Sequence, residues 1–229
     1  MNKLFEGVKC VFFDAGYTLV NEDAAWRERC RAQAETDEGR ALRWSAGDVL
    51  REIAPASAQM LPQYRAVIEK FHIERPVPYQ SAYETLYEDA LPALTALRPR
   101  YKLGIIANQQ AGLETRLKKW GAAAYMDVVV SSFEAGVSKP DPAIFRLALQ
   151  KAGCEPAKAL MAGDRPGNDI LPKRLACAPC ASDAALRPHR SRLTHDMRRT
   201  AKYHRWPNWF SGCCKTFCDS LIKRYASAY

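Results

Sequence analysis

The sequence predicts an α/β fold, in which a parallel sheet carries helices on both faces and an α-helical segment is inserted after the first strand. Three observations support it. Short apolar runs typical of buried strands recur along the chain, helical patterns separate the later runs, and the strand pattern disappears between residues 20 and 89. Alternating strands and helices form a parallel sheet, because each crossover helix carries the chain back to the end of the sheet where the previous strand began, and the next strand then runs in the same direction.

The first strand is predicted over residues 9–14, where the apolar run Cys-Val-Phe-Phe meets Asp14 and an Ala-Gly turn. Further strands are predicted at residues 101–107, 126–131 and 159–162. The polar residues at or just past strand ends are Asp14, Asn108, Ser131 and Asp164. Because the carboxyl ends of parallel strands share one edge, we expect the chemistry to gather there.

Two helices are predicted between the later strands. Residues 112–121 carry apolar side chains at helical spacing, and residues 141–152 place their apolar side chains on one face, with Pro142 in the first turn. The inserted segment has candidate helices at residues 24–34, 46–53 and 60–71. We therefore expect a core formed by residues 1–19 and 90–176 and a helical cap formed by residues 20–89.

The composition is that of a globular protein. Of 229 residues, 48% are hydrophobic and 26% are charged, which excludes a disordered or fibrous chain. The first residues lack the apolar stretch of a secretory signal, and no run is long enough to cross a bilayer. We therefore expect a cytoplasmic protein that does not partner a membrane. We also expect Cys10, Cys30 and Cys154 to be free, mostly buried thiols.

Four short segments follow one another along the chain, three of them at predicted strand ends. They are Asp14-Ala-Gly-Tyr-Thr18, Ala107-Asn108, Ser138-Lys139-Pro140-Asp141, and Gly163-Asp164 followed by Asp169. In this order and context they resemble the motifs of the haloacid dehalogenase (HAD)-like hydrolase superfamily, over residues 9 to about 176. The resemblance implies a Rossmann-like core and a helical cap of the kind found in subfamily I (type C1).

The resemblance also implies a magnesium-dependent phosphatase acting on a small phosphorylated metabolite. Asp14 is the implied nucleophile and Lys139 the catalytic cation, because a carboxylate can attack an anionic phosphoryl group only where positive charge cancels the repulsion. Magnesium ligation is implied for Asp14, the carbonyl group of Gly16, Asp164 and Asp169, the last of which could orient Lys139 instead. Thr18 and Asn108 are the implied substrate-site residues.

Two positions depart from the family pattern. Phosphatases of this family normally carry a second aspartate two residues after the nucleophile, as the general acid, and here that residue is Gly16. The family normally has a Ser or Thr that contacts the phosphoryl group, and here that residue is Ala107. Asn108, Gln109 or backbone N–H groups could make this contact instead. General acid–base catalysis contributes about 10²–10⁴-fold, so turnover of unactivated esters should suffer unless another group replaces it.

These departures leave two alternative functions open. One is a 2-haloacid dehalogenase, because halide needs no proton to leave. The family's dehalogenases, however, do not normally keep an acidic pair such as Asp164 and Asp169 for magnesium. The other is a binding or regulatory protein on a catalytically weakened scaffold, which Gly16 and Ala107 permit.

The end of the chain has a different composition. Residues 1–172 hold 22 basic and 22 acidic residues, whereas residues 173–229 hold 12 basic and 3 acidic ones and supply the whole net charge of +9. The family's expected Leu-Gly-Met and final strand are missing after Leu175. One added base after the Leu175 codon can restore Leu-Gly-Met, so we interpret residues 177–229 as the product of a frameshift, with low order after about Pro179. Sequencing the gene tests this interpretation, and a reading through the Leu175 codon with no missing base relative to close relatives would exclude the frameshift.

Two functional readings of the tail remain as alternatives. Cys177 and Cys180, with later cysteines and histidines, could form a zinc site, but one Cys-x-x-Cys pair is a weak signal. A basic arm with Trp206 and Trp209 could bind nucleic acid, which we do not expect. The sequence gives no indication of the oligomeric state.

Overall fold

The computed structural model describes residues 7–58, 63–165 and 168–169. Its centre is a parallel four-stranded sheet in the order β5-β4-β1-β6. The strands are β1 (Cys10–Phe13), β4 (Lys102–Ala107), β5 (Val128–Ser131) and β6 (Ala159–Ala162). All four predicted strands are present, and β1 is central, with Phe13 opposite both Ile105 and Ala162. The carboxyl ends therefore meet at one edge, and the predicted α/β class is confirmed.

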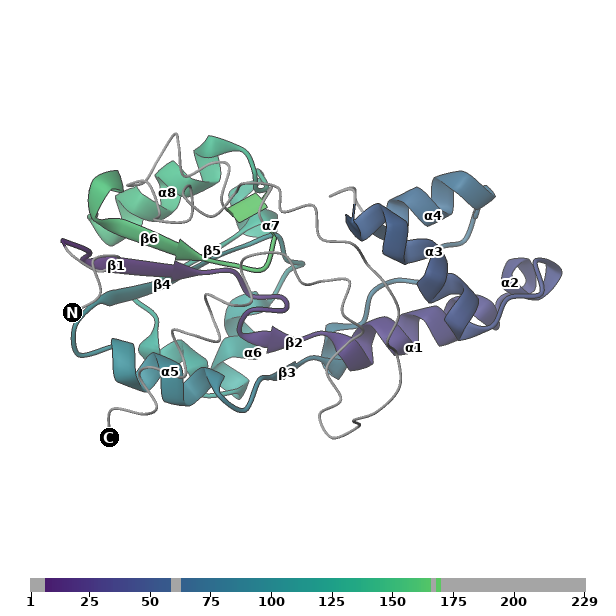
Figure 1. The fold of residues 1–229 in the computed structure, drawn as a ribbon, viewed down its shortest axis with the longest axis horizontal. Helices are drawn as coiled ribbons and strands as arrows, with labels where there is room; N and C mark the ends of the chain where they lie inside the picture. The colour runs from purple at the N-terminus through teal and green to yellow at the C-terminus, as the bar shows by residue number, and fades with distance from the viewer. Residues whose placement is uncertain (1–6, 59–62, 166–167, 170–229) are drawn as a thin grey trace, which may run out of the picture.

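Helices cover both faces of the sheet (Figure 1). They are α5 (Ala90–Leu97), α6 (Leu113–Lys119), α7 (Ser132–Ala135) and α8 (Pro142–Ala152), with short 3₁₀ turns at Ala122–Tyr125 and Pro156–Lys158. Alternate residues of β1 serve opposite cores: Val11 and Phe13 pack with α5 and α6, whereas Cys10 and Phe12 pack with α8. This alternation, which follows from the two-residue side-chain period of a strand, explains why the strands are apolar on both sides.

The predicted core helices are confirmed within a residue or two, and their ends have clear causes. Gly112 and Gly121 flank α6 with positive φ angles of 81° and 75°, a conformation that favours glycine. The side chain of Asp141 accepts the N–H of Ala143 at 2.8 Å and caps α8, which ends at the left-handed Gly153. Helix α5 was not singled out from the sequence.

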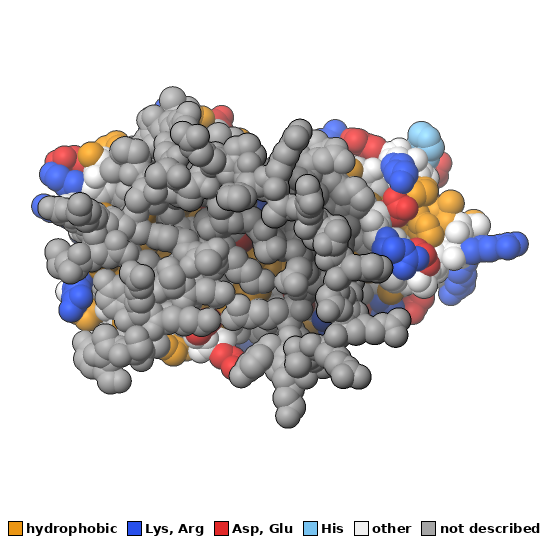
Figure 2. Space-filling model, in the orientation of Figure 1, with side chains coloured by type: hydrophobic (Ala, Val, Ile, Leu, Met, Phe, Trp, Pro, Cys, Tyr) orange, Lys and Arg blue, Asp and Glu red, His pale blue; other side chains and the backbone are white. Residues whose placement is uncertain are grey.

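The segment between β1 and β4 is helical, as expected. Its helices are α1 (Asp23–Ala34), α2 (Asp37–Ala41), α3 (Ala46–Ala58) and α4 (Gln63–Phe71), followed by a 3₁₀ turn at Ser81–Tyr83. Helices α1, α3 and α4 enclose a separate apolar cluster that includes Cys30, Val49 and Val67. The cap extends to one side of the sheet (Figure 1), and at that end Figure 2 shows basic and acidic side chains interspersed with apolar ones.

A two-stranded ribbon joins the cap to the core, and the sequence did not predict it. Strand β2 (Val20–Asn21) pairs antiparallel with β3 (Thr85–Leu86), with Val20 opposite Leu86. The ribbon brings the two ends of the inserted segment side by side. Helix α2 was also missed, because its five residues are too few to show a helical period.

Several expectations can be set against the described residues. Cys10, Cys30 and Cys154 are free, and the first two are buried, as predicted. Within the described residues, every helix is too short or too polar to span a membrane. The frameshift, the loss of order after Pro179, the zinc site and the basic arm all concern residues 170–229, which lie outside the described part of the chain.

Candidate active site

Asp14 directly follows β1, at the carboxyl edge of the sheet. Its backbone N–H donates to the carbonyl of Ala162 at 2.8 Å, which continues the β1–β6 ladder by one residue. Its Oδ1 accepts the N–H of Ala15 at 2.7 Å, and the residue is 8% exposed. The strand end therefore holds this carboxylate in a fixed position with a small opening toward solvent.

Lys139 reaches Asp14 from the loop between α7 and α8. Its Nζ lies 2.9 Å from Oδ1 of Asp14 and 2.7 Å from Oδ1 of Asp169, and its side chain is 1% exposed. Burial by itself lowers the pKa of this ammonium group, but the two carboxylates outweigh that effect and the pKa is raised. Lys139 is therefore a buried, fully charged cation beside the predicted nucleophile.

Asn108, which follows β4, fixes the backbone of Lys139. Its Oδ1 accepts the N–H of Lys139 at 2.7 Å, and its Nδ2 donates to the carbonyl of Lys139 at 2.8 Å. Both polar atoms of the amide are thus used to hold the lysine loop. The structure gives Asn108 a positioning role, while the predicted contact with substrate stays a prediction.

Three carboxylates converge beside this lysine. Asp14, Asp164 and Asp169 each offer an oxygen, and these oxygens all lie within 4.8 Å of one another. Burial is the largest cause that raises the pKa of Asp164, and repulsion from Asp14 is the second. The same two causes raise the pKa of Asp169 to about 6. A cluster of close, partly buried carboxylates is suited to Mg²⁺, which prefers oxygen ligands and relieves their repulsion. The donor set therefore fits the predicted metal.

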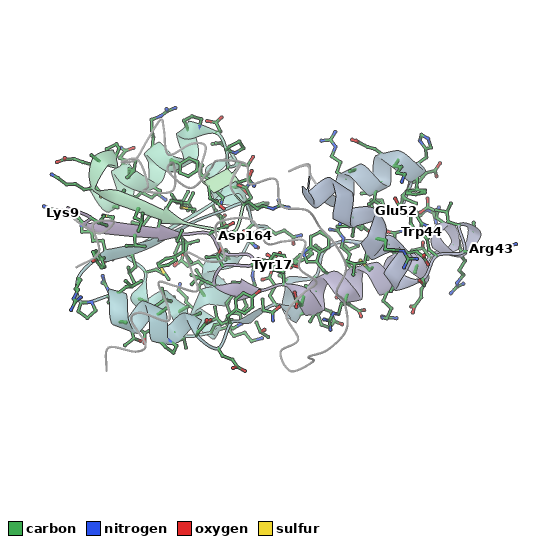
Figure 3. The ribbon with its side chains drawn as sticks, viewed as in Figure 1. Lys9, Tyr17, Arg43, Trp44, Glu52 and Asp164 are labelled. Atoms are coloured by element: carbon green, nitrogen blue, oxygen red, sulfur yellow. The ribbon has the colours of Figure 1, made fainter. Side chains whose placement is uncertain are left out.

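The three carboxylates differ in exposure and in how many of their oxygens already accept hydrogen bonds. Asp169 is fully buried, and its two oxygens accept from Lys139 Nζ at 2.7 Å and from the N–H of Arg165 at 3.0 Å. Asp164 is partly exposed at the carboxyl end of β6, near the boundary of core and cap (Figure 3). This arrangement favours the orienting role for Asp169 over direct ligation. Asp14 and Asp164 remain the more accessible carboxylates.

The loop after Asp14 turns back on itself. Tyr17 has a positive φ of 53°, and its N–H donates to the carbonyl of Val20 at 2.8 Å, while Gly16 forms an isolated bridge with Val20. The Oγ1 atom of Thr18 is buried and has no hydrogen-bond partner among the described residues. The tight loop holds Gly16 and Thr18 close to Asp14, but it gives Thr18 no identified contact there.

A polar network joins the cap to this edge of the core, and motif reasoning missed most of it. Oε1 of Glu22, at the start of α1, accepts from Gln109 Nε2 at 2.9 Å, and Arg116 donates to Oε1 of Gln109 at 2.8 Å. Burial, and to a smaller extent the charge of Glu84, raises the pKa of Glu22 to about 7. The only sequence signal for Glu22 as a site residue is that it is a carboxylate eight positions after Asp14, and no spacing rule distinguishes it from other acidic residues.

An open depression lies beside the network. It has a volume of about 630 Å³ and is lined by residues 108–110, after β4, and by residues 132–133 and 136–138, after β5. Its position at the strand ends is where parallel α/β sheets bind ligands. Two of its lining residues, Asn108 and Gln109, also belong to the contacts described above.

A parallel α/β core, an inserted helical cap and an Asp–Lys–Asp cluster at the strand ends together define a HAD-like hydrolase. The family model for haloacid dehalogenase-like hydrolases matches residues 8–172. The chain belongs to this family.

Among curated relatives, the chain is 36% identical over 107 residues to pyrophosphatase PpaX of Bacillus velezensis, which covers 46% of each chain. It is 35% identical over 116 residues to phosphoserine phosphatase of Thermus thermophilus, covering 49% of this chain and 47% of the relative. The chain thus spans about half the length of these two. A longer match is glyceraldehyde 3-phosphate phosphatase of Methanothermobacter thermautotrophicus, 29% identical over 186 residues, covering 72% of this chain and 80% of the relative.

Solved structures agree with the fold. A HAD phosphatase from Thermococcus onnurineus superposes with a TM-score of 0.57 at 24% identity, over 74% of this chain and 83% of that one. YfnB of Bacillus subtilis, a HAD hydrolase bound to magnesium, superposes with a TM-score of 0.52 at 18% identity, over 74% of this chain and 85% of that one.

Proposed function

We propose that this protein hydrolyses small phosphate monoesters by transferring the phosphoryl group to Asp14, with Mg²⁺ as cofactor. The observation that carries the proposal is the contact of the Lys139 ammonium group with Asp14 at 2.9 Å inside a cluster of three carboxylates. Two relatives, named as a phosphoserine phosphatase and a glyceraldehyde 3-phosphate phosphatase, support the substrate class, and the third, named as a pyrophosphatase, supports phosphoryl transfer more generally.

Each residue of the cluster has a role in this reaction. A carboxylate oxygen of Asp14 attacks phosphorus, and an aspartyl-phosphate forms as the leaving alcohol departs. Lys139 neutralises charge on the phosphoryl oxygens, and Asp169 keeps the ammonium group in place through its 2.7 Å contact. Asp14, the carbonyl group of Gly16 and Asp164 would hold Mg²⁺. When bound, this ion supplies further positive charge for the developing negative charge in the transition state.

The test compares the wild-type protein with Asp14→Asn, using p-nitrophenyl phosphate and a panel of small phosphate monoesters. We expect phosphate release that requires Mg²⁺, stops on addition of EDTA and falls by at least about 10³-fold in Asp14→Asn, because the amide is not a nucleophile. Asp37→Asn is the matched control, since the Asp37 side chain is fully exposed on the cap. It should retain wild-type activity.

The same experiment separates the alternatives. Release of chloride from 2-chloropropionate without phosphatase activity would identify a dehalogenase. No turnover of either class by a folded protein would identify a binding or regulatory scaffold.

We also propose a cytoplasmic location, which the free thiols Cys10, Cys30 and Cys154 support, because reduced cysteines are the rule in that compartment.

A further inference from the structure

The space beside Gly16 is filled by a carboxyl group from elsewhere in the chain. A Cβ atom built on Gly16 would lie 2.8 Å from Cδ of Glu22 and still closer to its Oε1. No side chain could be added at position 16 without moving that group. The carboxyl group of Glu22 therefore occupies the volume that a side chain two residues after Asp14 would otherwise fill.

The fold of the loop brings the two residues together. The N–H of Val20 donates to the carbonyl of Ala15 at 2.9 Å, and Gly16 bridges to Val20, so the chain reverses directly after Asp14. Strand β2 then leads into Glu22, the N-cap residue of α1. As a result, the side chain of Glu22 lies over the start of the loop that it has just left.

Two donors hold the Glu22 carboxyl group in place. Gln109 Nε2 donates to Oε1 at 2.9 Å, and Trp26 Nε1 donates to Oε2 at 3.3 Å. Gln109 is itself held by Arg116 at 2.8 Å. One donor comes from the core and one from the cap, so the carboxyl group is fixed at their boundary.

We propose that Glu22 is a catalytic residue that performs the proton transfers for which position 16 has no side chain. The inference rests on the proposed function. In the first step Asp14 bonds to phosphorus, the bond from phosphorus to the leaving oxygen breaks, and Glu22 gives that oxygen a proton. In the second, Glu22 takes a proton from the water that attacks phosphorus, which releases phosphate and restores both carboxyl groups.

The leaving group of the substrate provides the test. Benzyl, phenyl and p-nitrophenyl phosphates have rings of similar size, but their leaving oxygens differ widely in basicity. For Glu22→Gln we expect kcat/KM to fall by about 10²–10⁴-fold with benzyl phosphate and by less than about tenfold with p-nitrophenyl phosphate, whose leaving group needs no proton. The variant should also accumulate aspartyl-phosphate, seen as a burst of p-nitrophenol. Glu114→Gln, on the exposed face of α6, should match wild type.

A swap of the two positions is a second test, independent of how well Glu22→Gln folds. In Glu22→Ala/Gly16→Asp the new aspartate has the space that Glu22 leaves, and we expect at least a tenfold recovery with benzyl phosphate over Glu22→Ala. Equal losses with all three esters, or a folded double variant no better than Glu22→Ala, would contradict the proposal while leaving the phosphatase intact. No phosphate release by the wild-type protein would overturn the phosphatase itself, and the role of Glu22 with it.

Discussion

Lys139 is the residue on which the charge of the site depends. An ammonium group taken out of water costs several kcal/mol unless carboxylates and hydrogen bonds compensate it. Here Asp14 and Asp169 do so at 2.9 and 2.7 Å, and the amide of Asn108 fixes the backbone that carries the side chain. The dependence is mutual, because without the lysine the carboxylates would be left close together with like charge.

Lys139→Met should therefore destabilise the protein as well as inactivate it. We expect the free energy of unfolding in urea to fall by about 3–5 kcal/mol, the usual cost of removing one partner from a buried ionic cluster. Lys119→Met is the control, since Lys119 is exposed on α6, and its effect should stay within about 0.5 kcal/mol. A Lys139 variant as stable as wild type would show that the carboxylates do not need this cation.

At the scale of the element, β4 is confined by its neighbours in the sheet. A Cβ atom added at Gly104 would lie 2.7 Å from the Phe12 ring on β1 and 3.1 Å from the carbonyl oxygen of Val128 on β5. Glycine is normally unfavourable within a strand, by about 0.5–1 kcal/mol relative to alanine. Here the lack of a side chain lets the Phe12 ring pack against the strand, and the neighbouring backbone cannot retreat.

Gly104→Ala should thus destabilise the protein by about 1–3 kcal/mol, because overpacking outweighs the gain in strand preference. Urea unfolding monitored by circular dichroism measures the change. Combining it with Phe12→Leu should recover part of the loss, since the two side chains compete for one space. At Gly47, exposed in the first turn of α3, a Cβ atom meets nothing closer than 3.6 Å, so Gly47→Ala should be neutral or slightly stabilising. Similar losses at both positions would rule out the steric explanation.

At the scale of the whole molecule, the cap and the core are joined through buried charge. Nε of Arg116, on α6, lies 2.9 Å from Oε2 of Glu84, which directly precedes β3 near the end of the cap segment, and the two side chains are 13% and 1% exposed. Burial raises the pKa of Glu84, and Arg116 opposes that rise. The exposed pair of Arg31 with Glu28 lies within one helix, and exposed pairs of this kind contribute at most about 1 kcal/mol.

Arg116→Met should cost about 3–5 kcal/mol at neutral pH, because it leaves the Glu84 carboxylate buried without the cation that compensates its charge. The loss has a predictable pH dependence. A folded-state pKa raised above the ordinary value of 4.5 makes stability fall as the pH rises, and losing Arg116 raises this pKa further. Urea unfolding at pH 5 and pH 8 should therefore show a larger difference from wild type at pH 8. Arg31→Met should show little loss at either pH, and a flat response of Arg116→Met would contradict this account.

Local sequence patterns were sufficient to predict the architecture apart from α2 and α5, whereas Lys139 and Asp169 were assigned to the site by the family resemblance. The strands, the helices on both faces and the inserted cap could be predicted because their side-chain periods are local, and each apolar run shows which faces it buries. Asp14, Asn108 and Asp164 could be assigned to one edge for a related reason. Parallel strands place their carboxyl ends together wherever they stand in the chain.

The way in which these residues contact one another became visible only in the folded chain. The amide of Asn108 holds the backbone of Lys139. Both oxygens of Asp169 accept hydrogen bonds, from Lys139 and from Arg165. The carboxyl group of Glu22 fills the space beside Gly16. The two-residue ribbon strands and the pairing of Arg116 with Glu84 were equally hidden. Such contacts join loops distant in the sequence, and their partners are fixed by how cap and core pack together, which no local spacing of residues records.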